Sequence, residues 1–242
     1  MTLEGTNTYV VGRAPAYVID PGPADSAHVE AVRRAAADRG GVAGILLTHS
    51  HADHSAGVSM LDAPLLVGEV GMGDEGSGAR GADPAGPARG SAQARRVGPF
   101  EVLATPGHAA DHVCFLLGRV GFCGDLVLGH GSSFVPPDGG SLTAYLDSLR
   151  RLRAANLELL CPGHGPYITD PAAKVDEYLE HRMMREERLV SALGEGVRSR
   201  ARLLDLAWDD VPVELRGAAA VVMQAHLEKL AAEGRLPDDI TE

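Results

Sequence analysis

Residues Thr48 to Gly57 read THSHADHSAG, directly after the apolar run 43–47, which reads AGILL. A short run of this kind, rich in Ile and Leu, predicts a buried strand. Four side chains able to bind a metal then fall within six positions: His49, His51, Asp53 and His54. They would lie at the carboxyl end of a strand, where open sheets usually place their sites. Imidazoles with a carboxylate suit a zinc ion that keeps one position open for water, and packing does not explain donors at this density.

Three more candidate donors follow predicted strands elsewhere in the chain. His108 and His164 each close a Pro-Gly-His sequence, in which a tight turn presents the imidazole at the end of a strand. Asp125 follows the predicted strand 121–124, and a carboxylate at such a place suits a bridge between two metal ions. We therefore assign two metal sites, with Asp125 between them. The first is His49, His51 and His108, and the second is Asp53, His54 and His164.

The remaining polar candidates have weaker arguments. Asp20 ends an apolar strand before Pro21-Gly22, and it fits equally a residue of the turn or a carboxylate that orients a metal ligand. His112 opens an apolar strand, which favours a buried, hydrogen-bonded histidine over a ligand. His130 follows Asp125 by five positions without any spacing argument. Other histidines are not expected to be ligands: His28, a solvated residue, and His181 and His226, on predicted helices.

Alternating strands and helices make up most of the chain. Predicted strands cover 8–11, 16–19, 43–47, 65–68, 97–105, 113–117, 121–124 and 159–161. Predicted helices cover 26–39, 141–155, 171–193, 203–208 and 213–232. Ser26 is the expected cap of the first helix, and Gly40-Gly41 ends it. The segment 69–94 is rich in Gly and Ala and predicts a long, mobile loop, which is either an active-site flap or a solvated insertion without a role.

Composition limits the classes of protein to consider. With 242 residues, 45% hydrophobic and 23% charged, the chain is long enough for one large domain or for one domain plus a small appendage. No apolar run approaches the roughly 20 residues of a membrane span, and the N-terminus lacks the pattern of a signal peptide. The three cysteines form no CxxC pair, so we expect reduced core residues in a cytoplasmic protein. The net charge of −11 argues weakly against binding to nucleic acid or an anionic membrane, although a metal site still makes a local positive spot.

The motifs together resemble the metallo-β-lactamase superfamily: HSHADH, PGH at His108, GD at Asp125 and PGHG at His164. This resemblance implies an α+β fold, a four-layer αβ/βα sandwich, and it matches Asp20 to the first conserved aspartate of the family. TLEGTNTYVVG, GDLVLGHGSS and PGHGPYI followed by a long helix resemble the lactamase-β-2-like branch, which carries a C-terminal winged-helix-like domain and includes single-strand RNA endonucleases. The similarity covers nearly the whole chain and is weakest in 69–94.

The resemblance also implies a division into domains. We expect a catalytic domain in 1–170 and a small helical, winged-helix-like domain in 171–242. The branch usually has one more strand before TLEGTN, so either the chain begins late or this edge is absent, and the wing after Leu236 is expected to be short. The tail 171–242 holds 10 Lys and Arg against 15 Asp and Glu, which favours a packing or dimerisation module, and hence a homodimer, over a nucleic-acid reader.

The expected activity is hydrolysis at a binuclear centre with two zinc ions per chain, Mn²⁺ or Fe being the other candidate metals. Metal-bound hydroxide would attack an ester or thioester of a small molecule, and Asp53 would orient the nucleophile and accept its proton. The alternative is a single-strand-specific endoribonuclease, because similarity along the whole chain favours RNA whereas net charge favours a small substrate. A third reading is a non-catalytic, metal-stabilised binding protein. A true β-lactamase is not expected, because Asp125 resembles the glyoxalase II, thioesterase and nuclease branches.

Overall fold

The computed structural model describes residues 5–68, 95–136 and 139–241. Its first sheet contains four strands in the order of the chain: β1 (Tyr9–Val11), β2 (Ala16–Ile19), β3 (Val42–Leu46) and β4 (Leu65–Val67). β1 and β2 pair antiparallel, and the other neighbours pair parallel. The crossover from β2 to β3 is helix α1 (Ser26–Ala37), whose N-cap is Asp25 rather than the predicted Ser26. The Asp25 carboxylate accepts a hydrogen bond from the His28 amide at 2.7 Å.

The second sheet contains five strands, again in the order of the chain. They are β5 (Arg96–Val97), β6 (Phe100–Ala104), β7 (Val113–Leu117), β8 (Val120–Gly124) and β9 (Leu159–Pro162). Pairing is antiparallel up to β8, and β8 pairs parallel with β9 after the crossover helix α3 (Leu142–Ala154). The segment 97–105, predicted as sheet, belongs to a hairpin of β5 and β6, because Gly98, with φ of +53°, turns the chain back.

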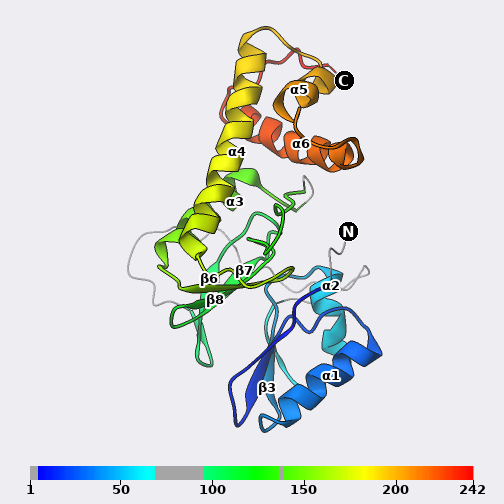
Figure 1. Ribbon diagram of the computed structural model, residues 1–242, viewed down its shortest axis with the longest axis vertical. Helices are drawn as coiled ribbons and strands as arrows, with labels where there is room; N and C mark the ends of the chain where they lie inside the picture. The colour runs from blue at the N-terminus through cyan, green and yellow to red at the C-terminus, as the bar shows by residue number, and fades with distance from the viewer. Residues whose placement is uncertain (1–4, 69–94, 137–138, 242) are drawn as a thin grey trace, which may run out of the picture.

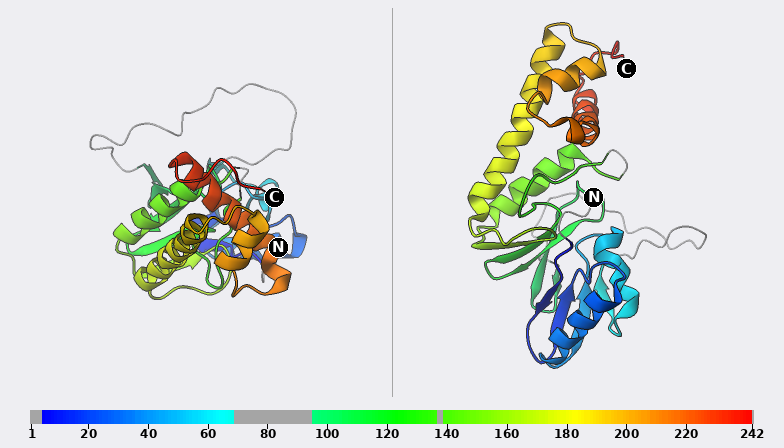
Figure 2. Two further views of the ribbon diagram at one scale, coloured as in Figure 1. Left: turned by 90° about the horizontal axis from the view of Figure 1, so that it is seen from above. Right: turned by 45° about the vertical axis from the view of Figure 1, so that its right-hand side comes forward.

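The two sheets face each other, and helices cover their outer faces (Figures 1 and 2). Alternation along the strands divides the side chains between the layers. In β2, Val18 packs toward α1 while Ile19 packs between the sheets. In β7, Phe115 packs between the sheets while Cys114 packs toward α3. These layers are the predicted four-layer αβ/βα sandwich.

The C-terminal part is helical and has a hydrophobic core of its own. It consists of α4 (Pro171–Gly194), α5 (Arg200–Ala207), the short 3₁₀ turn η2 (Val213–Leu215) and α6 (Arg216–Ala232), where the sequence predicted one helix over 213–232. Its core contains Leu189, Leu203, Trp208, Met223 and Leu227. Helix α4 is shared, since Val175 and Tyr178 in its first half belong to the core of the sandwich. The boundary between 170 and 171 therefore stays a prediction.

The motif that follows β3 begins as the predicted loop, which carries His49 and His51, and becomes helical at Ala52. Residues Ala52–Ser55 form helix α2, and Ala56–Met60 continue as the 3₁₀ helix η1. Asp53 and His54 consequently lie on a helical turn, where His54 Nε2 is 3.7 Å from Asp53 Oδ2. The expected flap in 69–94 lies outside the described residues. In the described part of the chain, every helix is too short or too polar to cross a membrane.

Candidate metal centre

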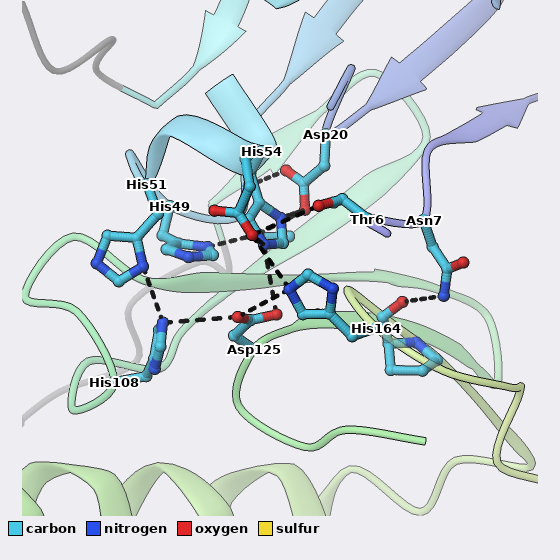
Figure 3. A network of polar contacts seen from close by, with 12 residues as sticks. Thr6, Asn7, Asp20, His49, His51, His54, His108, Asp125 and His164 are labelled. Atoms are coloured by element: carbon cyan, nitrogen blue, oxygen red, sulfur yellow. Dashed lines mark hydrogen bonds and ion pairs between the residues drawn. The ribbon is translucent and has the colours of Figure 1, made fainter. Parts of the chain in front are cut away.

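The seven predicted donors lie together where the two sheets meet. Figure 3 labels six of them, all except Asp53. The first sheet contributes the motif after β3, and the second contributes the turn after β6 and the ends of β8 and β9. Three groups of these donors have their ligand atoms within 4.8 Å of one another: His49, His51 and His108; His49, His54 and Asp125; and Asp53, His54 and His164.

Asp125 lies between the two predicted sets of donors. Its Oδ2 is 3.7 Å from His108 Nε2 and 3.4 Å from His164 Nε2. Its Oδ1 is 3.4 Å from His54 Nε2. Within the sets, His108 Nε2 lies 3.1 Å from His51 Nδ1, and His164 Nε2 lies 3.3 Å from Asp53 Oδ2. One carboxylate thus faces nitrogen donors on both sides, as a bridging ligand must.

The chemistry of this cluster fits a metal. Among the residues that the structure describes, His49 Nε2, His54 Nε2 and Asp125 Oδ1 are buried without a hydrogen-bond partner. An unsatisfied buried polar atom costs about 1–3 kcal/mol, and metal binding to these three donor atoms would remove that cost. The cluster also needs Gly163, because a Cβ there would lie 2.3 Å from Asp125 Oδ1.

Asp20 supports the centre from behind. Its carboxylate is buried and accepts hydrogen bonds from Thr48 N at 2.8 Å, Thr48 Oγ1 at 2.7 Å and His54 Nδ1 at 3.0 Å. Of the two readings of Asp20, these contacts match the carboxylate that orients a ligand. Because Nδ1 of His54 donates to Asp20, Nε2 is the nitrogen that faces the cluster and that would bind a metal once its proton is displaced.

Two backbone carbonyls orient further histidines, and neither was anticipated from the sequence. His108 Nδ1 donates to the carbonyl of Phe134 at 2.6 Å, and His164 Nδ1 donates to the carbonyl of Gly5 at 2.8 Å. Every residue carries a carbonyl, so residue type gives no signal of these contacts. The same N-terminal segment reaches Asp53, whose Oδ2 accepts from Thr6 Oγ1 at 3.4 Å. The TLEGTN motif marked this segment only through the family resemblance.

Side-chain pairs set the charge of the centre. Burial opposes protonation of His54, but Asp20 and Asp125 outweigh it and raise its pKa to about 10. Hydrogen bonds to Asp125 and then to Asp53 raise the pKa of His164 to about 10. Burial would raise the pKa of Asp125, but His164 and His54 hold it far below its usual range. Burial lowers the pKa of His49, so this imidazole is neutral. Two protons thus occupy positions that a metal would take.

The other histidines form no part of these groups. His112 is buried and bonded to Thr105 Oγ1 at 2.9 Å, which confirms the structural reading. His130 is exposed. His28 is not simply solvated as predicted, since it is half-buried and its Nε2 lies 2.8 Å from Thr8 Oγ1. His181 and His226 lie on α4 and α6, away from the three groups.

Known proteins are similar to this chain in sequence and in fold. Residues 1–164 match the metallo-beta-lactamase superfamily model, and residues 201–239 match the beta-lactamase associated winged helix domain. The chain is 36% identical to the lactamase-like protein adaB of Aspergillus niger, over 98% of this chain and 78% of that protein. It is 31% identical to an atrochrysone carboxyl ACP thioesterase of Aspergillus chevalieri, over 97% of this chain and 78% of that protein.

Solved structures agree. The metallo-beta-lactamase family protein TTHA1429 from Thermus thermophilus superposes with a TM-score of 0.68 at 25% identity, over 95% of this chain and 89% of that chain. TTHA1623 in a di-iron-bound form superposes with a TM-score of 0.52 at 28% identity, over 71% of this chain and 94% of that chain. With its fold, its clustered donors and these matches, the chain belongs to the metallo-β-lactamase superfamily of hydrolases and carries the associated winged helix domain.

Proposed function

We propose that the protein is a binuclear zinc hydrolase that cleaves an ester or thioester of a small molecule. The observation that carries this proposal is the clustering of seven donors in three overlapping groups, with three buried donor atoms left unpartnered. We propose that these donors form two sets with Asp125 between them. The first set is His49, His51 and His108, and the second is Asp53, His54 and His164. Two divalent metals, when bound, lower the pKa of water and polarise the bond to be cleaved.

The protein's own groups then orient the reactants. Asp53 is the catalytic carboxylate in this proposal, because 29% of its side chain is exposed whereas only 13% of Asp125 is. The contact with His164 is the main cause that lowers the pKa of Asp53, so this carboxylate is ionised at neutral pH and able to accept a proton from the nucleophile. Asp20 keeps His54 in the tautomer that binds from Nε2.

Several observations support a small, acyl-type substrate. One relative is named as a thioesterase that acts on an acyl carrier protein. The net charge of −11 disfavours a polyanionic substrate. Phe134, whose carbonyl accepts from His108, is 40% exposed, and in this proposal its ring is the apolar contact for an acyl group.

The second candidate is cleavage of single-stranded RNA, with the same metals acting at phosphorus. The observation that favours it is a pair of exposed arginines, Arg95 and Arg96, at the start of β5. A third arginine, Arg89, lies outside the described residues. The acidic tail argues against this candidate, and we assign the helical part a packing or dimerisation role.

We also propose a cytoplasmic location, which is supported by three cysteines that are free and buried.

Salt dependence separates the two substrate classes. Zinc-loaded protein should be offered a series of acyl thioesters and a single-stranded RNA, and kcat/KM should be measured between 50 and 200 mM salt. Each phosphate contact to single strands gives a slope of about −0.7 in log affinity against log salt, so about four contacts imply a roughly fifty-fold loss over this fourfold range. A thioester bound by metals and an apolar wall should show a shallow response.

The control is the double change Arg95→Ala and Arg96→Ala. We expect thioester turnover that is insensitive to both salt and this change. Efficient RNA cleavage that falls steeply with salt, and less steeply in the double variant, would overturn the proposed substrate class and leave the metal chemistry intact. Failure to hydrolyse either class with metal bound would count against a hydrolase of these substrates.

A further inference from the structure

The loop that follows Asp125 is held from behind by helix α4. Tyr178, in the first half of α4, accepts a hydrogen bond from Leu128 N at 3.1 Å and donates one to the carbonyl of Gly131 at 2.8 Å. Arg182, one turn later, donates from Nη2 to Ser132 Oγ at 3.1 Å and to the carbonyl of Ser133. Two successive turns of one helix therefore bind both halves of the loop.

The other side of the same loop touches two candidate metal ligands. Ser133 Oγ donates to the carbonyl of Asp125 at 2.5 Å. The next carbonyl, that of Phe134, accepts from His108 Nδ1 at 2.6 Å. Arg182 binds Ser133, which itself contacts Asp125 and directly precedes Phe134. A shift at Ser133 would therefore move both Asp125 and His108.

The guanidinium of Arg182 is buried, and its hydrogen bonds go to this loop. The side chain is 2% exposed, and among the described residues no carboxylate forms an ion pair with it. Its guanidinium lies 5.4 Å from the ring centre of Tyr145, whose hydroxyl donates to the carbonyl of Leu126 at 2.7 Å. Burying a cation without a carboxylate partner is costly, and one carbonyl, one hydroxyl and an aromatic face compensate for it only in part. The two oxygens to which Nη2 donates both belong to the loop.

A neighbour on the same helix provides the comparison. Arg185 is equally buried, at 3% exposed. It donates to the carbonyl of Ala207 at 2.6 Å and to Asp210 at 2.7 and 3.0 Å. Its contacts thus hold α5 and the segment after it, and none of them involves the loop after Asp125.

We propose that Arg182 is a positioning residue of the metal centre. It fixes Ser132–Phe134 so that Ser133 holds Asp125 and the Phe134 carbonyl holds His108 with Nδ1 protonated and Nε2 free. Helix α4 would then help to position the ligands of the hydrolytic site. This inference rests on the proposed function in taking the cluster to be a metal site, and partners behind a ligand of this kind are worth about 10–100-fold in metal affinity.

The test compares Arg182→Ala with Arg182→Lys and Arg185→Ala in the full chain. Zinc affinity is measured by competition with a chromophoric chelator, and stability is measured by urea unfolding of the metal-free protein. The Nδ1 proton of His108 is followed by NMR in the metal-free protein, where a weakened bond to Phe134 appears as faster exchange with water. Ser133→Ala is the second route, because it removes the bond to Asp125 with little loss of packing.

We expect Arg182→Ala to lower zinc affinity by about tenfold or more and to speed exchange at His108. Excess zinc should restore kcat, because the change affects assembly of the site. Lysine should restore only part of the affinity, because it keeps the charge without the planar fork of donors. Arg185→Ala should lower stability while zinc affinity and His108 exchange stay as in the wild type.

Two results would overturn the proposal: unchanged zinc affinity and exchange in folded Arg182→Ala, or an equal loss of zinc affinity in Arg185→Ala. If Arg182→Ala does not fold, unchanged zinc affinity and His108 exchange in Ser133→Ala overturn it instead. Failure of the proposed zinc hydrolase function is a separate outcome, which would appear as a wild type that binds no zinc. The comparison of His108 exchange between wild type and variants would still be valid in that case, because it is made in the metal-free protein.

Discussion

Asp53 and His130 are the residues at which the assignment of roles can be tested most directly. Asp53 belongs to a donor group and contacts His164, whereas His130 is exposed and belongs to no group. Replacing Asp53 with Ala should lower kcat/KM by about a hundredfold or more, because both proton transfer and a metal ligand are lost. The measurement is kcat/KM at saturating zinc, with His130→Ala as the control. A comparable loss in His130→Ala would mean that the substrate side of the centre is misplaced.

The raised pKa values of His54 and His164 predict how metal binding depends on pH. Both values, about 10, lie above the ordinary 6.5, so both imidazoles are protonated at pH 7 without metal. Zinc must displace these protons, and its affinity should rise by up to about tenfold per pH unit for each proton displaced. Mixing zinc with metal-free protein in weakly buffered indicator at pH 7.5 should show acidification. Asp20→Asn should release less, because Asp20 helps to raise the pKa of His54. Absence of any proton release would contradict the charge state described above.

The same pKa shifts make the stability of the metal-free protein fall with rising pH, whereas zinc affinity rises. Protons held more tightly in the folded state stabilise it fully below the ordinary pKa of 6.5. This contribution is lost as pH rises through about 10. Urea unfolding of the metal-free protein between pH 6 and 10 should therefore show stability falling toward the alkaline end of the range.

At the scale of elements, the Pro-Gly-His turn after β6 packs directly against helix α3. Gly107 has φ of +140°, and a Cβ there would lie 2.3 Å from Tyr145 Cα. The Gly107 carbonyl also accepts from Ser141 N, just before α3, at 2.9 Å. Gly107→Ala should cost about 3 kcal/mol of unfolding free energy, since backbone strain and overlap with a helix add together.

The matched control for that turn is Gly118, which has φ of +59° and open space around its missing side chain. Gly118→Ala should cost only about 1–2 kcal/mol, the strain of the left-handed conformation alone. Denaturant unfolding of both variants without metal measures the difference. Equal costs would show that α3 moves aside without penalty.

For the whole molecule, the centre joins the two sheets. His49 and Asp53 follow the first sheet, while His108, Asp125 and His164 belong to the second. Metal binding should therefore stabilise the entire sandwich, by about 4 kcal/mol when free zinc exceeds its Kd a thousandfold. Elemental analysis should find about two metal ions per chain, and Tm should rise with zinc but not with Mg²⁺, which prefers oxygen ligands. Persistent absence of metal after zinc is supplied would refute the metal centre.

The sequence by itself identified the candidate donors and most of the architecture. His49, His51, Asp53 and His54 are close in the chain after an apolar strand, so their proximity is a local property. Pro-Gly-His turns and periodic apolar residues are local in the same sense, which is why most strands and the helical C-terminal part could be predicted. The four layers were implied only by the family resemblance. The hairpin at Gly98 was missed because its strands read as one apolar segment.

Only the tertiary structure decided how the donors are oriented. Asp20 could equally be a turn residue until β2 was placed beside β3, where its carboxylate reaches His54. Gly5, Phe134 and Arg182 act through contacts with residues far away in the chain. Carbonyl groups are common to all residues and a buried arginine has no spacing pattern. Residue type therefore determines which groups can bind a metal, and packing between distant segments determines which of their atoms face it.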